Sequence, residues 1–409
     1  MATTPVDSLP LGIDDIRAAR ELLDGVVRVT PLEGSRWLSA RVGGPVHLKC
    51  ENLQRAGSFK IRGAYVRIAR LSAEERSRGV VAASAGNHAQ GVALAASLLG
   101  IKATVYMPHG APLPKIAATQ AYGAEVRFAG TVIEEALAAA EAYAEATGAA
   151  FIHPFDHPDI VAGQGTVGLE ILEQCPEVRT VLACTGGGGL VSGIALVLKS
   201  VRPDVRVVGV QAEGAAAFPP ALAAGAPLTL GAMATMADGI AVGRPGELTF
   251  RIVRELVDEV LTVSEEALSK ALLLCLERAK LVVEPAGVAG VAALLAEPRA
   301  FEPPVVAVLS GGNIDPLLLL RVLRHGLAAS GRYLSFRVRI PDRPGALVQL
   351  LTVLAEADAN VFDLEHVRTD ARLRVDEVEV ALQVESRGPD HCAEVLARMR
   401  GAGYTVIFG

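Results

Sequence analysis

Residues 51–64 of the chain read ENLQRAGSFKIRGA. An apolar run of Val46, Leu48 and Cys50 precedes this stretch and predicts a short strand. The residues after Lys60 predict a helix, because apolar side chains recur there at helical spacing: Ile61, Ala64, Tyr65 and Ile68. Gly57-Ser58 is expected to supply the turn and the N-cap, which places Lys60 in the first turn of that helix.

Lys60 differs from an ordinary surface lysine in this predicted setting. The positive end of a helix dipole disfavours its charged form, and burial against Phe59 would lower its pKa further. A neutral lysine is a nucleophile that can form a Schiff base with a carbonyl compound. The stretch therefore predicts a reactive lysine on a strand–turn–helix unit.

Composition sets the broad class of the protein. The chain has 409 residues, a length that suggests two or three domains, and its 51% hydrophobic content is that of a globular protein. A net charge of −6 favours neither nucleic acid nor an anionic membrane as a partner. The five cysteines form no C-x-x-C pair, and the N-terminus has no secretory signal, so we expect a reducing, cytoplasmic location. No apolar run is long enough to span a membrane.

Short apolar strands alternate with helices through most of the chain, which predicts an α/β fold with parallel sheets covered on both faces. Two such sheets, over about residues 50–155 and from there to about 330, would form two lobes with a cleft between them. The predicted strands are residues 46–50, 80–83, 103–107, 125–128, 180–184, 205–210 and 305–309, and the predicted helices are residues 13–24, 90–99, 115–122 and 132–146. Residues 212–250 are rich in Gly, Ala and Pro without periodicity, which indicates a functional loop.

A different pattern begins after the short connector at residues 328–331. Alternating apolar residues predict four strands, at residues 334–340, 360–368, 378–384 and 404–408. Helices are predicted around residues 347–354 and over 389–400. The order βαββαβ predicts a separate ferredoxin-like domain over residues 334–409.

Two glycine-containing turns follow predicted strands and open predicted helices. Gly186, Gly187, Gly188 and Gly189 could be a flexible linker, but their flanking strand and helix favour a nest of N–H groups that binds an anion. Residues 84–91, which read SAGNHAQG, could be a plain turn, or could hold a carboxylate on backbone N–H groups at the helix start.

The string SFKIRGA closely resembles the pyridoxal-phosphate attachment site of the serine/threonine dehydratases, which are fold type II pyridoxal-phosphate enzymes. This resemblance implies that the cofactor, pyridoxal 5'-phosphate, is attached to Lys60 and that Phe59 packs beside its ring. Residues 84–91 resemble the substrate loop of the same family. Ser84, Asn87 and His88 would then hold the amino-acid carboxylate, and Asn87 would also contact the ring hydroxyl.

Four further strings match the family. The tetraglycine resembles its cofactor-phosphate loop, and the string SGGN at residues 310–313 would place the Ser310 hydroxyl against the pyridine nitrogen. A hydroxyl cannot hold a full pyridinium charge, so the ring would favour elimination over transamination. The resemblance also places the Gly239 backbone and Glu284 at the pocket, although Glu284 could equally be a surface charge.

No metal site is expected. His153, Asp156 and His157 lie close together in sequence, but two prolines and the family resemblance favour a loop without a ligand role. Some relatives bind a divalent cation through a glutamate and a nearby aspartate. Here Glu213 is present, but Gly214 to Pro220 supplies no second carboxylate.

Residues 334–409 resemble the ACT domain, a small amino-acid-sensing module, in the turn at residues 341–347 and in the string NVFDLEH at 360–366. The whole resemblance implies a threonine ammonia-lyase (threonine dehydratase) that acts on L-threonine and, more slowly, L-serine. It further implies a homotetramer and an amino-acid effector, such as isoleucine, bound at the ACT domain. Whether the role is isoleucine biosynthesis or threonine catabolism stays open.

Two other functions stay open at this stage. The same scaffold supports racemases and other lyases, and in related serine racemases a serine stands where this chain has Ala85. The second alternative is a non-catalytic amino-acid sensor, against which the intact Lys60, tetraglycine and Ser310 argue.

Overall fold

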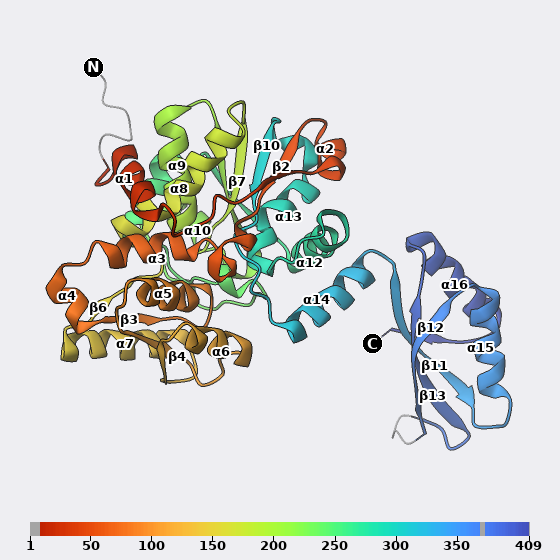
Figure 1. Ribbon diagram of the computed structural model, residues 1–409. Coiled ribbons are helices and arrows are strands. Elements are labelled where there is room, and N and C mark those ends of the chain that lie inside the picture. The colour runs from red at the N-terminus through yellow and green to blue at the C-terminus, as the bar shows by residue number, and fades with distance from the viewer. Residues whose placement is uncertain (1–8, 369–372, 409) are drawn as a thin grey trace. The chain divides into compact units, whose positions relative to one another are not determined.

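The structure is a computed structural model that describes residues 9–368 and 373–408 (Figure 1). The chain divides into two compact units, Met1–Leu318 and Leu319–Gly409. This division lies earlier in the chain than the connector predicted at residues 328–331. The assignment of a catalytic domain to residues 1–330 and an ACT domain to 334–409 stays a prediction.

The smaller sheet of the first unit is parallel, in the order β5 (Glu125–Phe128), β4 (Ala103–Met107), β3 (Val80–Ala83) and β6 (Ala150–Phe151). Alternate residues of a strand face opposite sides of a sheet. Val80 and Ala82 accordingly pack with α3 (Lys60–Ala69) and α5 (Asn87–Leu98), whereas Val81 and Ala83 pack with α7 (Ile133–Thr147). Both faces are therefore covered, as the continuous apolar strands predict.

The larger sheet has the order β1-β2-β10-β7-β8-β9, and only β1 is antiparallel to its neighbour. Its strands are β1 (Leu32–Gly34), β2 (Val46–Lys49), β10 (Val305–Val308), β7 (Thr180–Cys184), β8 (Arg206–Ala212) and β9 (Glu259–Val263). The sequence did not predict β9, because this edge strand is only partly buried and lacks a clear apolar pattern.

Three adjacent strands of this sheet lead into the predicted site. The stretch at residues 51–64 follows β2, Ser310 follows β10, and the tetraglycine follows β7. Because the carboxyl ends of parallel strands meet at one edge, the fold brings these segments together. The stretch also crosses between lobes, since β2 belongs to the large sheet and α3 packs on the small one.

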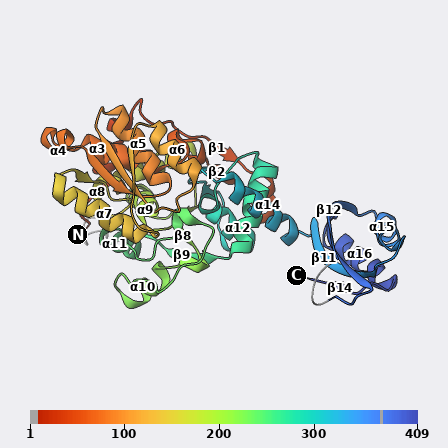
Figure 2. The same ribbon diagram turned by 90° about the horizontal axis from the view of Figure 1, so that it is seen from below.

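Helices cover the large sheet and join the lobes. α8 (Pro158–Gln174) packs against both α3 and α9 (Gly189–Val201). At the crossing of α8 and α3, a Cβ on Gly163 would lie 2.6 Å from the Gly63 Cα, which explains the two glycines there. α10 lies beside the edge strand β9 (Figure 2). The remaining helices of the unit are α1 (Ile13–Leu23), α2 (Arg36–Val42), α4 (Ala73–Arg78), α6 (Leu113–Ala121), α8 (Pro158–Gln174), α9 (Gly189–Val201), α10 (Phe218–Ala224), α11 (Glu247–Leu256), α12 (Glu265–Leu274), α13 (Ala289–Ala296) and, across the unit boundary, α14 (Pro316–Ala329).

The second unit confirms the predicted βαββαβ order. Its elements are β11 (Tyr333–Pro341), α15 (Ala346–Glu356), β12 (Asn360–Val367), β13 (Glu377–Glu385), α16 (Pro389–Gly401) and β14 (Val406–Ile407). The antiparallel sheet order β12-β13-β11-β14 is that of a ferredoxin-like fold. Phe336, Val338 and Ile340 face a core shared with Leu350 and Leu354 of α15, so the alternation seen in the sequence marks the buried face. Within residues 9–368 and 373–408, no helix has the length and apolarity needed to cross a membrane.

Candidate active site

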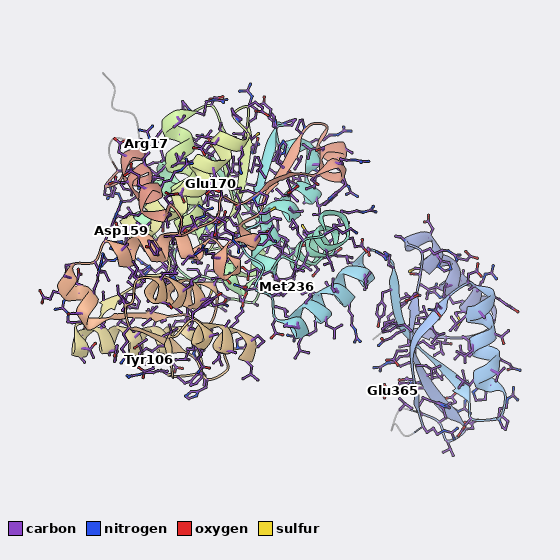
Figure 3. The ribbon with its side chains drawn as sticks, viewed as in Figure 1. Arg17, Tyr106, Asp159, Glu170, Met236 and Glu365 are labelled. Atoms are coloured by element: carbon purple, nitrogen blue, oxygen red, sulfur yellow. The ribbon has the colours of Figure 1, made fainter. Side chains whose placement is uncertain are left out.

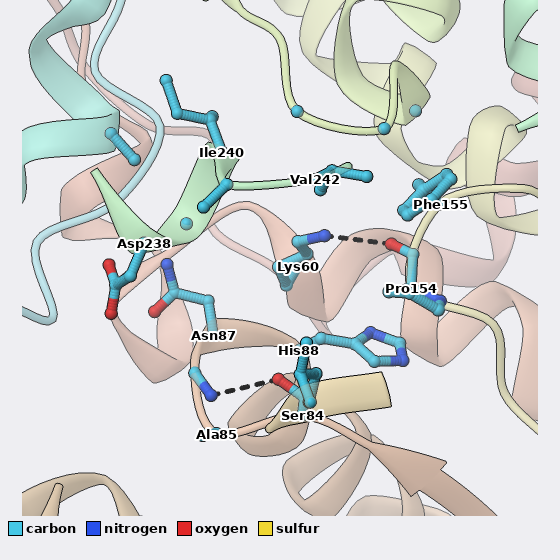
Figure 4. Close-up of a pocket in the computed structure, with 18 of the residues that line it drawn as sticks. Lys60, Ser84, Ala85, Asn87, His88, Pro154, Phe155, Asp238, Ile240 and Val242 are labelled. Carbon is cyan, nitrogen blue, oxygen red and sulfur yellow. Dashed lines mark hydrogen bonds between the residues drawn. The ribbon is translucent and has the colours of Figure 1, made fainter. Parts of the chain in front are cut away.

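A cavity of about 620 Å³ lies in the first unit where the loops after β2, β10 and β7 meet (Figure 4). The cavity contains every residue that the sequence assigned to cofactor or substrate. These are Phe59, Lys60, Ser84, Asn87, His88, Gly186, Gly187, Gly188, Gly189, Gly239 and Ser310. The site thus brings together residues that are far apart in the chain, such as Lys60 and Ser310.

Lys60 is the first residue of α3, as predicted, but the helix begins differently from the expectation. Phe59, with helical angles of φ −59° and ψ −17°, occupies the N-cap, and no side chain caps the helix. The predicted N-cap at Ser58 is therefore wrong, and its buried hydroxyl has no partner among the described residues. Ser58 instead pairs its extended backbone with Gly311.

The Lys60 side chain extends into the cavity. Its Nζ donates a hydrogen bond of 2.9 Å to the Pro154 carbonyl and lies 5.3 Å from the centre of the Phe59 ring. Burial lowers the pKa of Lys60 to about 8, and the nearby Cys184 and Glu284 oppose this shift. With this pKa, about a tenth of the amine is neutral at pH 7, far more than for an ordinary lysine, and the neutral amine is a nucleophile and a base.

The tetraglycine forms a tight loop at the start of α9. Gly188 has φ +97°, and a Cβ on Gly187 would lie 2.4 Å from the Phe155 ring. The Thr249 hydroxyl donates a 2.6 Å bond to the Gly187 carbonyl and so fixes this turn. Free N–H groups at a helix start, without side chains above them, suit a phosphate dianion.

The start of α5 forms a second part of the wall, with Gly86 as N-cap. The Ser84 hydroxyl accepts a 3.0 Å bond from the Gly86 N–H, as Figure 4 shows. His88 Nε2 lies 2.8 Å from the Ile152 carbonyl, and burial lowers its pKa to about 3. The neutral His88 ring is thus hydrogen-bonded to the backbone. The group of His88 that can bind a substrate carboxylate is therefore its backbone N–H, which lies in the first turn of α5.

Asn87 belongs to a chain of side-chain hydrogen bonds. Its Nδ2 donates to Glu284 Oε1 at 2.6 Å, and its Oδ1 accepts from Asn313 Nδ2 at 2.9 Å. Glu284 is only 2% exposed, so the surface-charge interpretation is wrong. Burial, assisted by the charge of Asp238, raises the pKa of Glu284 to about 7. A Cβ on Gly239 would lie 3.6 Å from Glu284 Oε1, so Gly239 borders the same corner.

Ser310 is 2% exposed and follows β10. The Cys184 thiol donates to its hydroxyl at 3.1 Å, which leaves the Ser310 proton free for another acceptor. Burial raises the pKa of Cys184 to about 11, so the thiol stays protonated. The sequence did not identify Cys184 as a site residue, although its place at the end of β7 could have indicated one.

Residues 153–157 contribute more than the sequence indicated. His153 Nδ1 accepts from the backbone N–H of Asp156 at 2.7 Å, which confirms a loop. The described part of the chain holds no group of three or more His, Cys, Asp or Glu residues that could bind a metal. The loop nevertheless lines the cavity through His153, Pro154 and Phe155. Asp156 accepts from Glu247 N and Thr249 N and thereby caps α11.

A cross-cavity ion pair was also missed by the sequence reading. Lys115 Nζ of α6 lies 2.5 Å from Asp238 Oδ2 of the 212–250 segment. That segment lines the cavity with Met233, Thr235 and residues 238–244, as expected of a functional loop. The structure places α10 and the start of α11 in this segment, but its cavity-lining part lies between them in backbone without periodicity, from which the residues that face the cavity could not be predicted.

The residues present fit pyridoxal phosphate. A nucleophilic lysine suits the aldehyde, the glycine loop at a helix start suits the phosphate, and a buried hydroxyl suits the ring nitrogen. Cβ atoms on Gly187 and Gly188 would collide with Phe155 and Phe218, so the loop can pack in this way only with glycine at both positions.

Comparison with known proteins agrees with this geometry. Residues 23–311 match the family described as pyridoxal-phosphate dependent enzyme. The L-threonine ammonia-lyase of Thermotoga maritima is 47% identical over 394 residues, which cover 96% of this chain and 98% of that protein. Two solved structures are similar. A threonine deaminase from T.th. has a TM-score of 0.71 and 44% identity over 75% of this chain and 99% of its own. Maize serine racemase has a TM-score of 0.73 and 39% identity over 78% and 98%.

The matched region contains Lys60, the tetraglycine and Ser310 and covers most of the first unit. The chain belongs to the family of pyridoxal-phosphate dependent enzymes.

Proposed function

We propose that the chain is an L-threonine ammonia-lyase, which converts L-threonine to 2-oxobutanoate and ammonia, and L-serine to pyruvate more slowly. The observation that carries this proposal is the half-buried Lys60 amine beside the glycine loop and Ser310 in one cavity. The choice of reaction is supported by 47% sequence identity to an L-threonine ammonia-lyase over nearly the full length of both chains.

The residues divide the work in the following way. When bound, pyridoxal phosphate withdraws electrons from the Cα of the substrate amino acid. Lys60, with its pKa of about 8, takes the proton from Cα, and the β-hydroxyl departs, so that the two leave overall as water. The released enamine then takes up one water to give 2-oxobutanoate and ammonia. Backbone N–H groups at the start of α5 hold the substrate carboxylate, and Asn87 orients the reacting centre.

Ser310 decides which reaction follows. Its hydroxyl, already accepting from Cys184, can donate one hydrogen bond to the ring nitrogen but cannot neutralise a full positive charge there. The ring is then a weaker electron sink than one paired with a carboxylate, which favours loss of the β-hydroxyl over transamination.

The experiment is to incubate the pyridoxal-phosphate-loaded protein with L-threonine and to measure 2-oxobutanoate and ammonia. Equal amounts of both, and a lower rate with L-serine, would support the proposal. Loaded protein that binds the cofactor but releases neither product would refute the lyase and favour the sensor alternative.

We further propose that the chain acts in the cytoplasm as a homotetramer and that the second unit binds an amino acid. A single βαββαβ unit has no internal partner, so pairing of such units requires another chain. The match to the T.th. threonine deaminase covers 99% of that chain but only 75% of this one, which supports independent folding of a catalytic part. An effector acts only through its different affinities for two arrangements.

Threonine saturation with and without each branched-chain amino acid tests this regulatory proposal. We expect isoleucine to shift the curve of the full chain, and a chain truncated near residue 332 to keep activity without that shift. An equal response in both chains would place the effector site elsewhere. Sedimentation of the full chain as a monomer would contradict the tetramer.

A further inference from the structure

A buried ion network lies beside the cavity and contains none of the residues assigned to the reaction. It consists of the cations Lys49 and Arg62 and the carboxylates Glu51 and Glu170, all of them at most 4% exposed. Glu170, on α8, is labelled in Figure 3. The charges balance, so the network places no net charge in the interior.

Arg62 is the centre of this network, and every one of its five N–H donors has an acceptor. Nε and Nη2 donate to the two carboxylate oxygens of Glu51, both at 2.8 Å, and Nη1 donates to Glu170 Oε1 at 2.7 Å. Nη1 also donates to Thr166 Oγ1 at 3.0 Å, and Nη2 to the Arg28 carbonyl at 3.3 Å.

Lys49 completes the arrangement from the end of β2. Its ammonium donates to Glu170 Oε2 at 2.5 Å, to the Thr30 carbonyl at 2.8 Å and to Gln174 Oε1 at 2.8 Å. All three ammonium donors are thus used. Burial would raise the pKa of Glu170, but the neighbouring Arg62 and Lys49 charges outweigh it and lower that pKa.

The network joins four segments at the point where the chain passes from one lobe to the other. Lys49 ends β2 of the large sheet, Glu51 follows it, Arg62 lies in α3, and Glu170 lies in α8. Arg62 is two residues after Lys60, in the same first turn of α3. The orientation of that turn therefore depends on the hydrogen bonds of the Arg62 guanidinium to its four acceptor residues, which are Arg28, Glu51, Thr166 and Glu170.

We propose that Arg62 is a positioning residue that fixes the first turn of α3 and thereby aims Lys60 into the cavity. A buried ion network adds little net stability compared with an apolar core. The presence of this network is therefore better explained by the one orientation in which it holds the first turn of α3. The planar guanidinium can bind both carboxylate oxygens of Glu51 and, at the same time, donate to Glu170. A lysine ammonium cannot form this arrangement.

The test compares Arg62→Lys, Thr166→Val and the unchanged protein, all loaded with pyridoxal phosphate. Thr166→Val removes one acceptor, keeps every charge and stays close to the original shape, so it tests the idea if Arg62→Lys fails to fold. Arg20→Lys is the matched control, because Arg20 also pairs with α8, through Glu173, but at the exposed surface. The activity readout rests on the proposed lyase function. The second readout, visible circular dichroism of the bound cofactor, does not.

We expect Arg62→Lys to lower kcat for threonine about tenfold or more with little change in KM, since small misplacement of a reacting group is costly. The visible dichroism per bound cofactor should fall with it, Thr166→Val should show a smaller change of the same kind, and Arg20→Lys none. Unchanged kcat and unchanged dichroism in Arg62→Lys and Thr166→Val would overturn the proposal. If the unchanged protein does not act on threonine, the lyase function fails, while the dichroism still decides the role of Arg62.

Discussion

Lys60 Nζ lies 2.9 Å from the carbonyl oxygen of Pro154, and the ring of the next residue, Phe155, packs against Gly187. One loop between the lobes therefore contacts both the reactive amine and the glycine loop. The adjacent Asp156 caps α11, whose Thr249 hydroxyl holds the Gly187 carbonyl. The spacing between the Lys60 amine and the tetraglycine loop is thus set by residues 154–156.

Replacing Lys60 by Ala should abolish turnover and the yellow colour of the loaded protein while the fold is kept. Lys60 is the first residue of α3 and extends into the cavity, and alanine removes this amine. Lys115, which also lines the cavity, is paired with Asp238. Product assays, visible absorbance and far-ultraviolet circular dichroism check this. Lys270→Ala, on α12 outside the cavity lining, is the control. Wild-type turnover by Lys60→Ala would refute the assignment.

Attachment of pyridoxal phosphate to the cofactor-free protein should depend on pH through Lys60. Its pKa is lowered to about 8, so the amine is protonated and unreactive below that pH and neutral above it. The attachment rate should rise with pH and level off above about 8, as followed by stopped-flow absorbance. A midpoint near the ordinary lysine value of 10.5 would show that burial does not act on this amine.

Gly187→Ala should weaken cofactor binding, because its Cβ would lie 2.4 Å from the Phe155 ring. A repacking cost of about 1–3 kcal/mol corresponds to a loss of affinity of order tenfold. Equilibrium titration with pyridoxal phosphate measures this. Gly110→Ala is the matched control, since nothing lies within 4 Å of its Cβ position. Adding Phe155→Ala should recover part of the loss, and equal affinities of Gly187→Ala and the unchanged protein would contradict the prediction.

Glu284→Gln should stabilise the protein more at pH 8 than at pH 4. The folded state raises the pKa of Glu284 from 4.5 to about 7, so it binds this proton more tightly than the unfolded state does. Stability is therefore lost as pH rises from about 4.5 through 7, by up to about 3 kcal/mol, and a glutamine avoids that loss. Urea unfolding of both proteins at each pH checks it. If the difference in unfolding free energy between the two proteins does not grow with pH, burial does not destabilise the charged form of Glu284.

Ala85→Ser should add racemisation to elimination. Ala85 lines the cavity beside Ser84, and the family resemblance places the serine of related serine racemases at this position. A racemase needs an acid on the face of Cα opposite the lysine, and alanine has no proton to give. Chiral chromatography of L-serine reactions should show little D-serine from the unchanged protein and more from the variant. Abundant D-serine from the unchanged protein would instead favour the racemase alternative.

The sequence by itself determined the elements that carry the site. Local patterns were sufficient for β3, β4 and β7, whose apolar runs match the observed strands, and for the βαββαβ order of the second unit. They were also sufficient for the tetraglycine and for Lys60 at a helix start. Each of these depends on contacts between residues that are close in sequence, so periodicity and turn chemistry reveal them.

The tertiary structure alone decided which distant groups meet. No local pattern shows that Pro154 accepts from Lys60, that Cys184 donates to Ser310, or that Glu284 is buried against Asn87. The sign of the pKa shifts depends on burial in the cavity, which in turn depends on how β2, β7 and β10 pair. Ser58 is a case in which a local pattern predicted a feature that the tertiary structure does not have. A good N-cap residue was overridden because its backbone pairs with Gly311, more than 200 residues away in the chain, and a long-range contact of that kind leaves no mark in the local sequence.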